Sequence, residues 1–167
     1  MKIHLWLNGK EISDEISPDM PLLEYVRTKG CYSVKRGCET SNCGLCTVWM
    51  NKKPVLSCSV LAARADGKEI VTLEGVQERA AEFGTYLANQ GGEQCGFCNP
   101  GFVMNAIALF RENPYPNEDE IKEFLSGNLC RCSGDEGQLR GILDYLRVKK
   151  AKEASVENKE NIAEEVK

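Results

Sequence analysis

Residues 37–58 read GCETSNCGLCTVWMNKKPVLSC and contain four cysteines, three of them in the spacing C-x4-C-x2-C and one further on. This spacing is typical of a [2Fe-2S] site in which a looping backbone wraps three thiolates around the cluster and a distant one completes it. Gly37 and Gly44 fit that chemistry, because glycine tolerates positive φ and lets backbone N–H groups approach the inorganic sulfides. We therefore predict a [2Fe-2S] cluster with four ligands: Cys38, Cys43, Cys46 and Cys58.

The second half of the chain contains four more cysteines, arranged as two close pairs. One pair is the C-x2-C of QCGFC at residues 94–98, and the other is the C-x-C of NLCRC at residues 128–132. Glycine or proline flanks each pair, which indicates loops at the ends of helices. A helical bundle that joins the two loops would assemble a second [2Fe-2S] cluster on four thiolates: Cys95, Cys98, Cys130 and Cys132.

Zinc is the alternative metal for these cysteines, and core packing is the alternative role for their side chains. Four thiolates commonly hold tetrahedral zinc in cytosolic proteins. Zinc sites favour two C-x2-4-C pairs, however, and neither set of cysteines follows that pattern. The number and spacing of the ligands favour iron-sulfur clusters over zinc.

Around the first cysteine loop, the sequence predicts a small mixed sheet crossed by one helix. Short runs of alternating apolar residues indicate strands, and a run with apolar residues at helical spacing ends at Gly30. The expected elements are a hairpin at 2–16 with its turn at Asn8-Gly9, a helix at 20–29, a hairpin at 47–58 with Cys58 on its return strand, and a strand at 70–73. Together they predict a first domain over residues 1–75.

After residue 75 the apolar residues recur at helical spacing. Asn117, followed three residues later by Glu120, is typical of a capping box at the start of a helix. Four short helices joined by tight loops can bury one shared core. We expect these helices around residues 76–87, 103–110, 117–125 and 139–146, in a second domain over residues 76–148. Residues 149–167 are rich in lysine and glutamate, and we expect a charged, disordered tail there.

Composition narrows the class of protein further. The chain has 167 residues and a formal net charge of −4, which argues against a nucleic-acid partner. We find no signal-peptide pattern and no run of 18 apolar residues, so we expect a cytoplasmic protein without a membrane span. In a reducing compartment clustered cysteines are more often metal ligands than disulfides. Nine cysteines leave Cys31 over, and its expected role is that of a buried small hydrophobe.

The chain shows no catalytic site of its own. His4 is the single histidine and lies in a predicted strand, so no Ser/His/Asp triad can be assembled. No phosphate-binding loop or G-x-G-x-x-G pattern is present. Any catalysis must come from a partner.

The cysteine motifs resemble those of a known family, the iron-sulfur subunits of molybdenum hydroxylases, which include xanthine dehydrogenase, aldehyde oxidoreductase and carbon monoxide dehydrogenase. The resemblance covers about residues 2–148 and matches all eight ligand positions in order; it is carried by VKRGC at 34–38, CGLCTV at 43–48, QCGFCNPG at 94–101 and GNLCRCSG at 127–134. It implies an α+β protein with an N-terminal β-grasp, plant-type ferredoxin domain followed by a four-helix [2Fe-2S] domain.

The same resemblance implies an electron-transfer subunit that passes electrons from a molybdenum centre through two [2Fe-2S] clusters towards FAD or another acceptor. The partners would be a molybdopterin-binding large subunit and an FAD-binding medium subunit. The second cluster would lie nearer the pterin, with Gln94 as a contact to it and Arg131 as a residue that tunes the cluster or only pairs with an acidic neighbour. A purine such as xanthine is the preferred substrate; aldehydes, nicotinate and carbon monoxide are alternatives.

Three loops depart from the common pattern of that family. Ser41 stands where glycine is usual, Asn99 where threonine is usual, and Ser133-Gly134-Asp135 where Thr-Gly-Tyr is commonest. None of these changes removes a ligand. All three lie beside predicted cluster ligands, so we expect effects on cluster potentials and on partner contacts.

Overall fold

The computed structural model describes the backbone of residues 1–165 and the side chains of residues 1–155. The first half of the chain forms a five-stranded sheet with strand order β2-β1-β5-β3-β4. β1 pairs in parallel with β5, and the other neighbours are antiparallel. The strands are β1 (Lys2–Leu7), β2 (Lys10–Glu15), β3 (Thr47–Met50), β4 (Lys53–Leu56) and β5 (Glu69–Val71).

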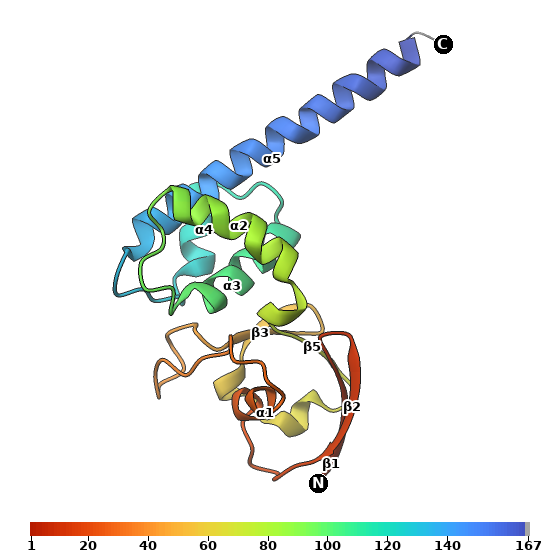
Figure 1. Ribbon diagram of the computed structural model, residues 1–167, viewed down its shortest axis with the longest axis vertical. Coiled ribbons are helices and arrows are strands. Elements are labelled where there is room, and N and C mark those ends of the chain that lie inside the picture. The colour runs from red at the N-terminus through yellow and green to blue at the C-terminus, as the bar shows by residue number, and fades with distance from the viewer. Residues whose placement is uncertain (166–167) are drawn as a thin grey trace.

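Both predicted hairpins form, each with a two-residue turn at positive φ. Asn8 and Gly9 have φ of 51° and 77°, and Asn51 and Lys52 have φ of 50° and 69°. Turns of this hand match the right-handed twist of the strands that they join. The helix α1 (Leu22–Thr28) lies against the sheet and buries Leu22, Leu23, Tyr25 and Val26 in the first hydrophobic core (Figure 1).

The predicted position of Cys58 on the return strand is wrong. Cys58 lies beyond the return strand, in the 3-10 helix η1 (Ser57–Ser59). The backbone N–H and the hydroxyl of Ser57 both donate to the carbonyl oxygen of Cys46, at 3.3 and 2.7 Å, and this ends the ladder. Two further 3-10 turns, η2 (Ala62–Ala65) and η3 (Leu73–Gly75), flank β5, and η3 leads into the second half of the chain.

The second half is helical, as predicted. Its helices are α2 (Gln77–Asn89), α3 (Asn99–Glu112), α4 (Glu118–Leu125) and α5 (Gly134–Glu165). The expected capping box is present at the start of α4, where Asn117 and Glu120 each accept from the other's backbone N–H at 3.0 and 2.8 Å. The α+β arrangement of a sheet followed by four helices is confirmed. No helix in the described part of the chain has the length and hydrophobicity that a membrane crossing needs.

The C-terminal stretch that we expected to be disordered is helical in the structure. The backbone stays helical through residues 149–165 as the end of α5, which extends away from the rest of the molecule (Figure 1). This stretch consists mainly of alanine, lysine and glutamate, which are strong helix formers, and contains neither glycine nor proline to end the helix. Residues 166–167 of the expected tail lie outside the described residues.

The two halves are joined by close packing of α3 on the sheet and on the first cysteine loop. Trp49 of β3 is buried in the core of the helical half, and its indole N–H donates to the carbonyl of Met104 at 2.9 Å. The guanidinium of Arg111 lies 3.8 Å from the centre of the Trp49 ring. Gly101 lies against the backbone of Gly44, where a Cβ atom would come within 2.3 Å of the carbonyl oxygen. These contacts hold the first cysteine loop against the helices.

Candidate metal centres

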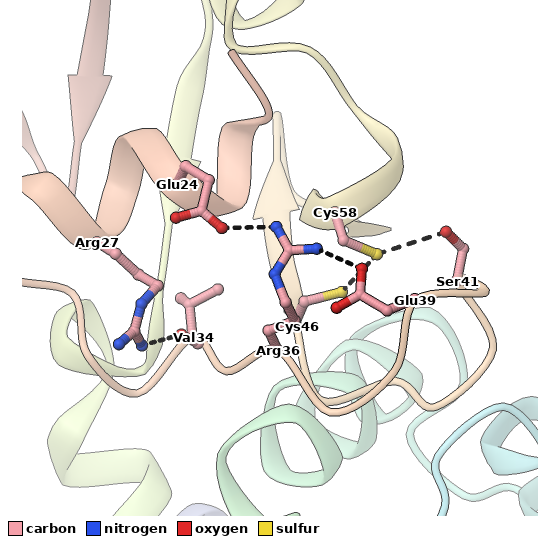
Figure 2. A network of polar contacts seen from close by, with 8 residues as sticks. All are labelled: Glu24, Arg27, Val34, Arg36, Glu39, Ser41, Cys46 and Cys58. Atoms are coloured by element: carbon pink, nitrogen blue, oxygen red, sulfur yellow. Dashed lines mark hydrogen bonds and ion pairs between the residues drawn. The ribbon is translucent and has the colours of Figure 1, made fainter.

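The first four predicted ligands come together beside α1. Three lie on the loop between α1 and β3, and the fourth, Cys58, lies in η1. The sulfur atoms of Cys46 and Cys58 are 3.3 Å apart (Figure 2). Cys38 and Cys43 form the second pair, and their thiols lie near enough to shift each other's pKa in opposite directions.

The second four predicted ligands meet at the ends of helices. Cys95 and Cys98 lie just before α3, with Cys98 as its N-cap, and the other two lie between α4 and α5. The sulfur atoms of Cys95 and Cys132 are 3.5 Å apart. Cys98 and Cys130 form the other pair, and their thiols lie near enough to shift each other's pKa in opposite directions. All nine cysteines of the chain are free of disulfide bonds.

The pairing of the thiols suits a two-iron centre better than a single metal ion. Among the described residues, no group of three or more histidine, cysteine, aspartate or glutamate side chains converges closely enough to hold one ion. Each set instead contains two pairs. In a [2Fe-2S] cluster each iron takes two thiolates, while two sulfides bridge the irons. The donor set in each half therefore fits a [2Fe-2S] cluster.

Each pair combines one thiol whose pKa is lowered with one whose pKa is raised. In the first set, hydrogen bonds led by the Asn42 backbone N–H lower the pKa of Cys38 to about 6, while burial raises that of its neighbour Cys43. Burial likewise raises the pKa of Cys46 to about 11. Burial opposes ionisation of Cys58 too, but hydrogen bonds led by that to Ser41 lower its pKa overall.

The second set repeats this pattern. The backbone N–H of Phe97 and the side chain of Cys132 lower the pKa of Cys95. The contact between the Cys95 and Cys132 side chains in turn raises the pKa of Cys132. Burial raises the pKa of Cys98 to about 11. Burial acts in the same sense on Cys130, but hydrogen bonds led by that to Ser133 bring its pKa down to about 7. In each pair one thiol therefore ionises before the other, and metal binding would displace the protons that remain.

Backbone geometry fits a loop closed tightly on a ligand. Gly44 has a φ of 76°, and a Cβ atom there would lie 2.4 Å from the amide nitrogen of Asn128. A Cβ atom on Gly37 would meet the side chain of Leu45 at 2.6 Å. The positive φ predicted for these glycines is found at Gly44 and not at Gly37, where a Cβ atom would instead displace the Leu45 side chain. In the second set, the N–H of Phe97 already donates to the Cys95 sulfur at 3.5 Å.

Two loops far apart in the sequence are tied together between the two sets of thiols. The N–H of Leu129 donates to the carbonyl of Cys43 at 3.0 Å, so a neighbour of Cys130 is bonded directly to a residue of the first set. The buried Asn128 donates to the carbonyl of Gly44 at 3.4 Å and accepts from Asn105 at 2.7 Å. A cleft of about 470 Å³ opens between the sets and is lined by six of the eight cysteines: Cys38, Cys43, Cys95, Cys98, Cys130 and Cys132.

The other residues named from the sequence take different places. Gln94 is exposed beside Cys95, and Arg131 is exposed at the rim of the cleft. Within the described residues Arg131 forms no ion pair, so the acidic neighbour considered for it is not found. His4 lies in β1 with its Nε2 2.6 Å from a carboxylate oxygen of Glu11, away from both sets of thiols. Cys31 is buried in the first core, as expected.

Polar side chains surround the first loop. Arg36 pairs with Glu24 at 2.6 Å and with Glu39 at 3.1 Å, which ties the loop to α1 (Figure 2). Lys35 reaches across to the second half, where its ammonium group donates to the carbonyl of Phe97 at 3.3 Å and lies 4.7 Å from the centre of the Phe97 ring. No local sequence pattern predicts the bridge made by Lys35, because it joins residues 62 positions apart.

All three departures from the family pattern touch a thiol. Ser41 lies 3.6 Å from the Cys58 sulfur, Asn99 lies 3.7 Å from the Cys98 sulfur, and Ser133 lies 3.5 Å from the Cys130 sulfur. The sequence did not predict a fourth polar contact, which runs from Gln138 to Cys98. The helical spacing could have predicted that Gln138 is buried, since it is four residues before the apolar Ile142 and so lies on the same buried face of α5.

Comparisons with known proteins agree with this geometry. Residues 6–73 match the model of the 2Fe-2S iron-sulfur cluster binding domain, and residues 72–143 match that of the [2Fe-2S] binding domain. The nicotinate dehydrogenase small FeS subunit of Eubacterium barkeri is 44% identical over 79% of this chain and 86% of its own length. The xanthine dehydrogenase iron-sulfur-binding subunit of Escherichia coli O157:H7 is 40% identical over 88% of this chain and 95% of its own length. Among solved structures, a chain of quinoline 2-oxidoreductase from Pseudomonas putida 86 superimposes with a TM-score of 0.82 at 35% identity, covering 92% of this chain and 96% of that chain.

Proposed function

Because this chain belongs to the family of small iron-sulfur subunits of molybdenum hydroxylases, we propose that it is the electron-transfer subunit of such a complex. The observation that carries the proposal is the grouping of eight thiols into two sets of two pairs that adjoin one cleft. A [2Fe-2S] cluster supplies one-electron transfer, so two clusters in one chain make a relay. The chain contributes ligands and a protein environment, and the partner subunit carries the catalytic site.

In this proposal the first cluster is held by Cys38, Cys43, Cys46 and Cys58, and the second by Cys95, Cys98, Cys130 and Cys132. The bond from Leu129 to Cys43 supports a short path between them, because it joins a neighbour of one ligand to another ligand through a single hydrogen bond. Tight packing of α3 on the first loop supports a fixed separation of the two sites. Electron transfer between two clusters needs both a short path and a fixed separation.

We propose that the second set of thiols faces the molybdopterin-binding subunit. Cys95 and Cys132 are exposed, and two large apolar side chains beside them are also uncovered, Phe97 at 49% and Leu129 at 51% exposure. Exposed apolar side chains that sit together are typical of interfaces. Gln94, exposed beside Cys95, has both a donor and an acceptor for the edge of a pterin, and Arg131 supplies positive charge at the same rim.

The first set is then the outlet towards an FAD-binding subunit or another acceptor. A purine such as xanthine is the proposed substrate of the complex, and nicotinate is the second candidate, because the similar subunits named above belong to dehydrogenases of xanthine and of nicotinate. A cytoplasmic location is proposed on the ground that none of the nine cysteines forms a disulfide bond, as is usual in a reducing compartment.

Cysteine-to-serine variants of the full chain, purified anaerobically with the subunits that accompany it, test the ligand assignment. C58S and C98S should each lose one of two EPR signals seen after dithionite reduction and about half of the iron. C31S is the matched control, since Cys31 is buried but belongs to neither set, and it should keep both signals. Loss of the same signal in C58S and C98S, or loss of iron in C31S, would contradict the assignment.

The partners and the substrate are tested on the same preparation. The tagged chain should retain molybdenum and flavin through purification, and anaerobic xanthine should bleach the visible absorption of the clusters. If nicotinate bleaches the clusters and xanthine does not, nicotinate is the substrate. A chain that purifies alone, without molybdenum, would contradict the proposed complex.

A further inference from the structure

A buried amide faces one of the second-set thiols. Gln138 lies in the first turns of α5 and is only 2% exposed. Its Nε2 atom lies 3.8 Å from the sulfur of Cys98, and this is the hydrogen bond that the described structure assigns to the side chain. The neighbouring residues on α5, Leu139 and Ile142, are buried and apolar.

Burial of an amide in such surroundings is unfavourable unless it is hydrogen-bonded. A thiolate that ligates iron has no proton and can only accept hydrogen bonds, so the amide must present its N–H group to Cys98. The hydrogen bond is therefore expected to persist, and to strengthen, when Cys98 is deprotonated.

The other polar side chains near these thiols are not committed in the same way. The hydroxyl of Ser133 lies 3.1 Å from the carbonyl oxygen of Gly92 and 3.5 Å from the Cys130 sulfur, so its single proton is shared between two acceptors. Asn99 turns its Oδ1 atom towards Cys98, and an oxygen cannot donate. Among the described side chains, Gln138 is the one whose donor is directed at a sulfur of the second set and at nothing else.

We propose that Gln138 is a positioning residue that sets the reduction potential of the second cluster through its hydrogen bond to Cys98. This inference rests on the proposed function, because it requires the second set of thiols to hold a cluster. Reduction adds one negative charge, part of which falls on the thiolates, so a donor to sulfur favours the reduced state. The effect is large for a buried donor, because little water is present to screen it.

The test is a redox titration of the full chain in the complex in which it is isolated, followed by EPR of each cluster. Gln138→Met keeps the length and volume of the side chain and removes the donor. We expect about a tenfold fall in the equilibrium constant for reduction of the second cluster, which corresponds to a shift of about 59 mV to lower potential. The first cluster, in the same molecules, should keep its potential and serves as an internal control.

Gln77→Met is the matched control variant. Gln77 is exposed at the start of α2, and the same substitution there should shift neither potential. Equal shifts of both clusters in Q138M, or no shift of the second cluster, would overturn the inference while leaving the proposed function intact. Loss of second-cluster iron in Q138M would also overturn it, since Gln138 would then act in assembly. Absence of both clusters from the unmodified chain would instead overturn the proposed function.

Discussion

At the scale of single residues, three side chains that depart from the common pattern of the family contact sulfur. Ser41, Asn99 and Ser133 were singled out in the sequence because they depart from a pattern, and each lies beside a thiol in the structure. A sequence pattern can locate such a residue next to a ligand in the chain. It cannot say which sulfur the side chain reaches, because Ser41 contacts Cys58 and not the nearer Cys38 or Cys43.

Ser41 carries a prediction of its own. Its hydroxyl has Cys58 as hydrogen-bond partner in the described structure, and its φ of 57° is one that glycine adopts more easily. In the described structure the Cys58 thiol donates to the Ser41 hydroxyl oxygen; a thiolate that ligates iron has no proton, so the hydroxyl would then be the donor. S41G removes this hydroxyl and the backbone strain together, whereas S41A removes the hydroxyl alone. Both variants should lower the potential of the first cluster by less than about 59 mV, since Ser41 is exposed and water screens its contribution.

The measurement is an EPR redox titration of the first cluster in both variants. S155A is the control, because Ser155 is exposed on α5 and donates to the carbonyl of Lys152. A fall in S41G with none in S41A would assign the effect to the backbone and contradict the role of the hydroxyl.

At the scale of elements, the contact of α3 with the first loop depends on one glycine. A Cβ atom on Gly101 would meet the Gly44 carbonyl at 2.3 Å and the Leu45 Cα at 2.8 Å, and neither can move without displacing the loop. G101A should therefore lower the free energy of unfolding by about 3 kcal/mol and reduce the iron content of the first set. Thermal unfolding and iron analysis check this.

A second helical glycine gives the matched control for that substitution. Gly84 in α2 has nothing within 4 Å of the position that a Cβ atom would take. G84A should leave the iron content unchanged and stabilise the chain by about 0.5–1 kcal/mol, because alanine loses less conformational freedom in a helix. Similar behaviour of G101A and G84A would show that the close approach of α3 to the loop is unimportant.

The carboxylate of Glu74 joins η3 to the segment that enters the first loop. It accepts from the N–H and the hydroxyl of Ser33 at 2.9 and 2.6 Å and from the hydroxyl of Thr72 at 2.6 Å. Burial opposes the charge, but these hydrogen bonds lower the pKa of Glu74 below its ordinary value of 4.5. The stabilisation is therefore present above pH 4.5 and is lost as the pH falls through the lower pKa of the folded state.

E74Q tests this linkage. At pH 7 the variant should be less stable than the unmodified chain by about 1–2 kcal/mol, since the amide cannot accept at both oxygens. The difference in unfolding free energy should shrink below pH 4.5, where the carboxylate of the unmodified chain becomes protonated. A difference that stays constant from pH 7 to pH 4 would show that the charge on Glu74 is not what stabilises the segment.

At the scale of the whole molecule, the local patterns of the sequence predicted the elements better than the contacts between them. The hairpin turns and the capping box each depend on residues close in sequence, and all were found. The thiol pairs do not, since Cys46 lies beside Cys58 and Cys95 beside Cys132. The position of Trp49 in the core of the helical half, the bridge from Lys35 to Phe97 and the bond from Leu129 to Cys43 depend on how the two halves pack. Periodicity within one element carries no information about such packing.

The end of α5 is the clearest difference between expectation and structure. Low apolar content predicted disorder at residues 149–165, and high helix propensity kept the backbone helical. Since this stretch extends away from the rest of the molecule (Figure 1), a chain that ends at Ala151 should keep its melting temperature within about 2 °C and retain both EPR signals. A larger loss of stability, measured by thermal unfolding, would show that the end of α5 supports the fold.

Whether one chain holds two [2Fe-2S] clusters can be decided by metal and sulfide analysis. Iron, zinc and acid-labile sulfide are measured per chain on anaerobically purified protein, and EPR is recorded after dithionite reduction. About four iron and four sulfide per chain, with two distinct S = 1/2 signals, is the result that we predict. Zinc without sulfide, and no EPR signal after reduction, would contradict it.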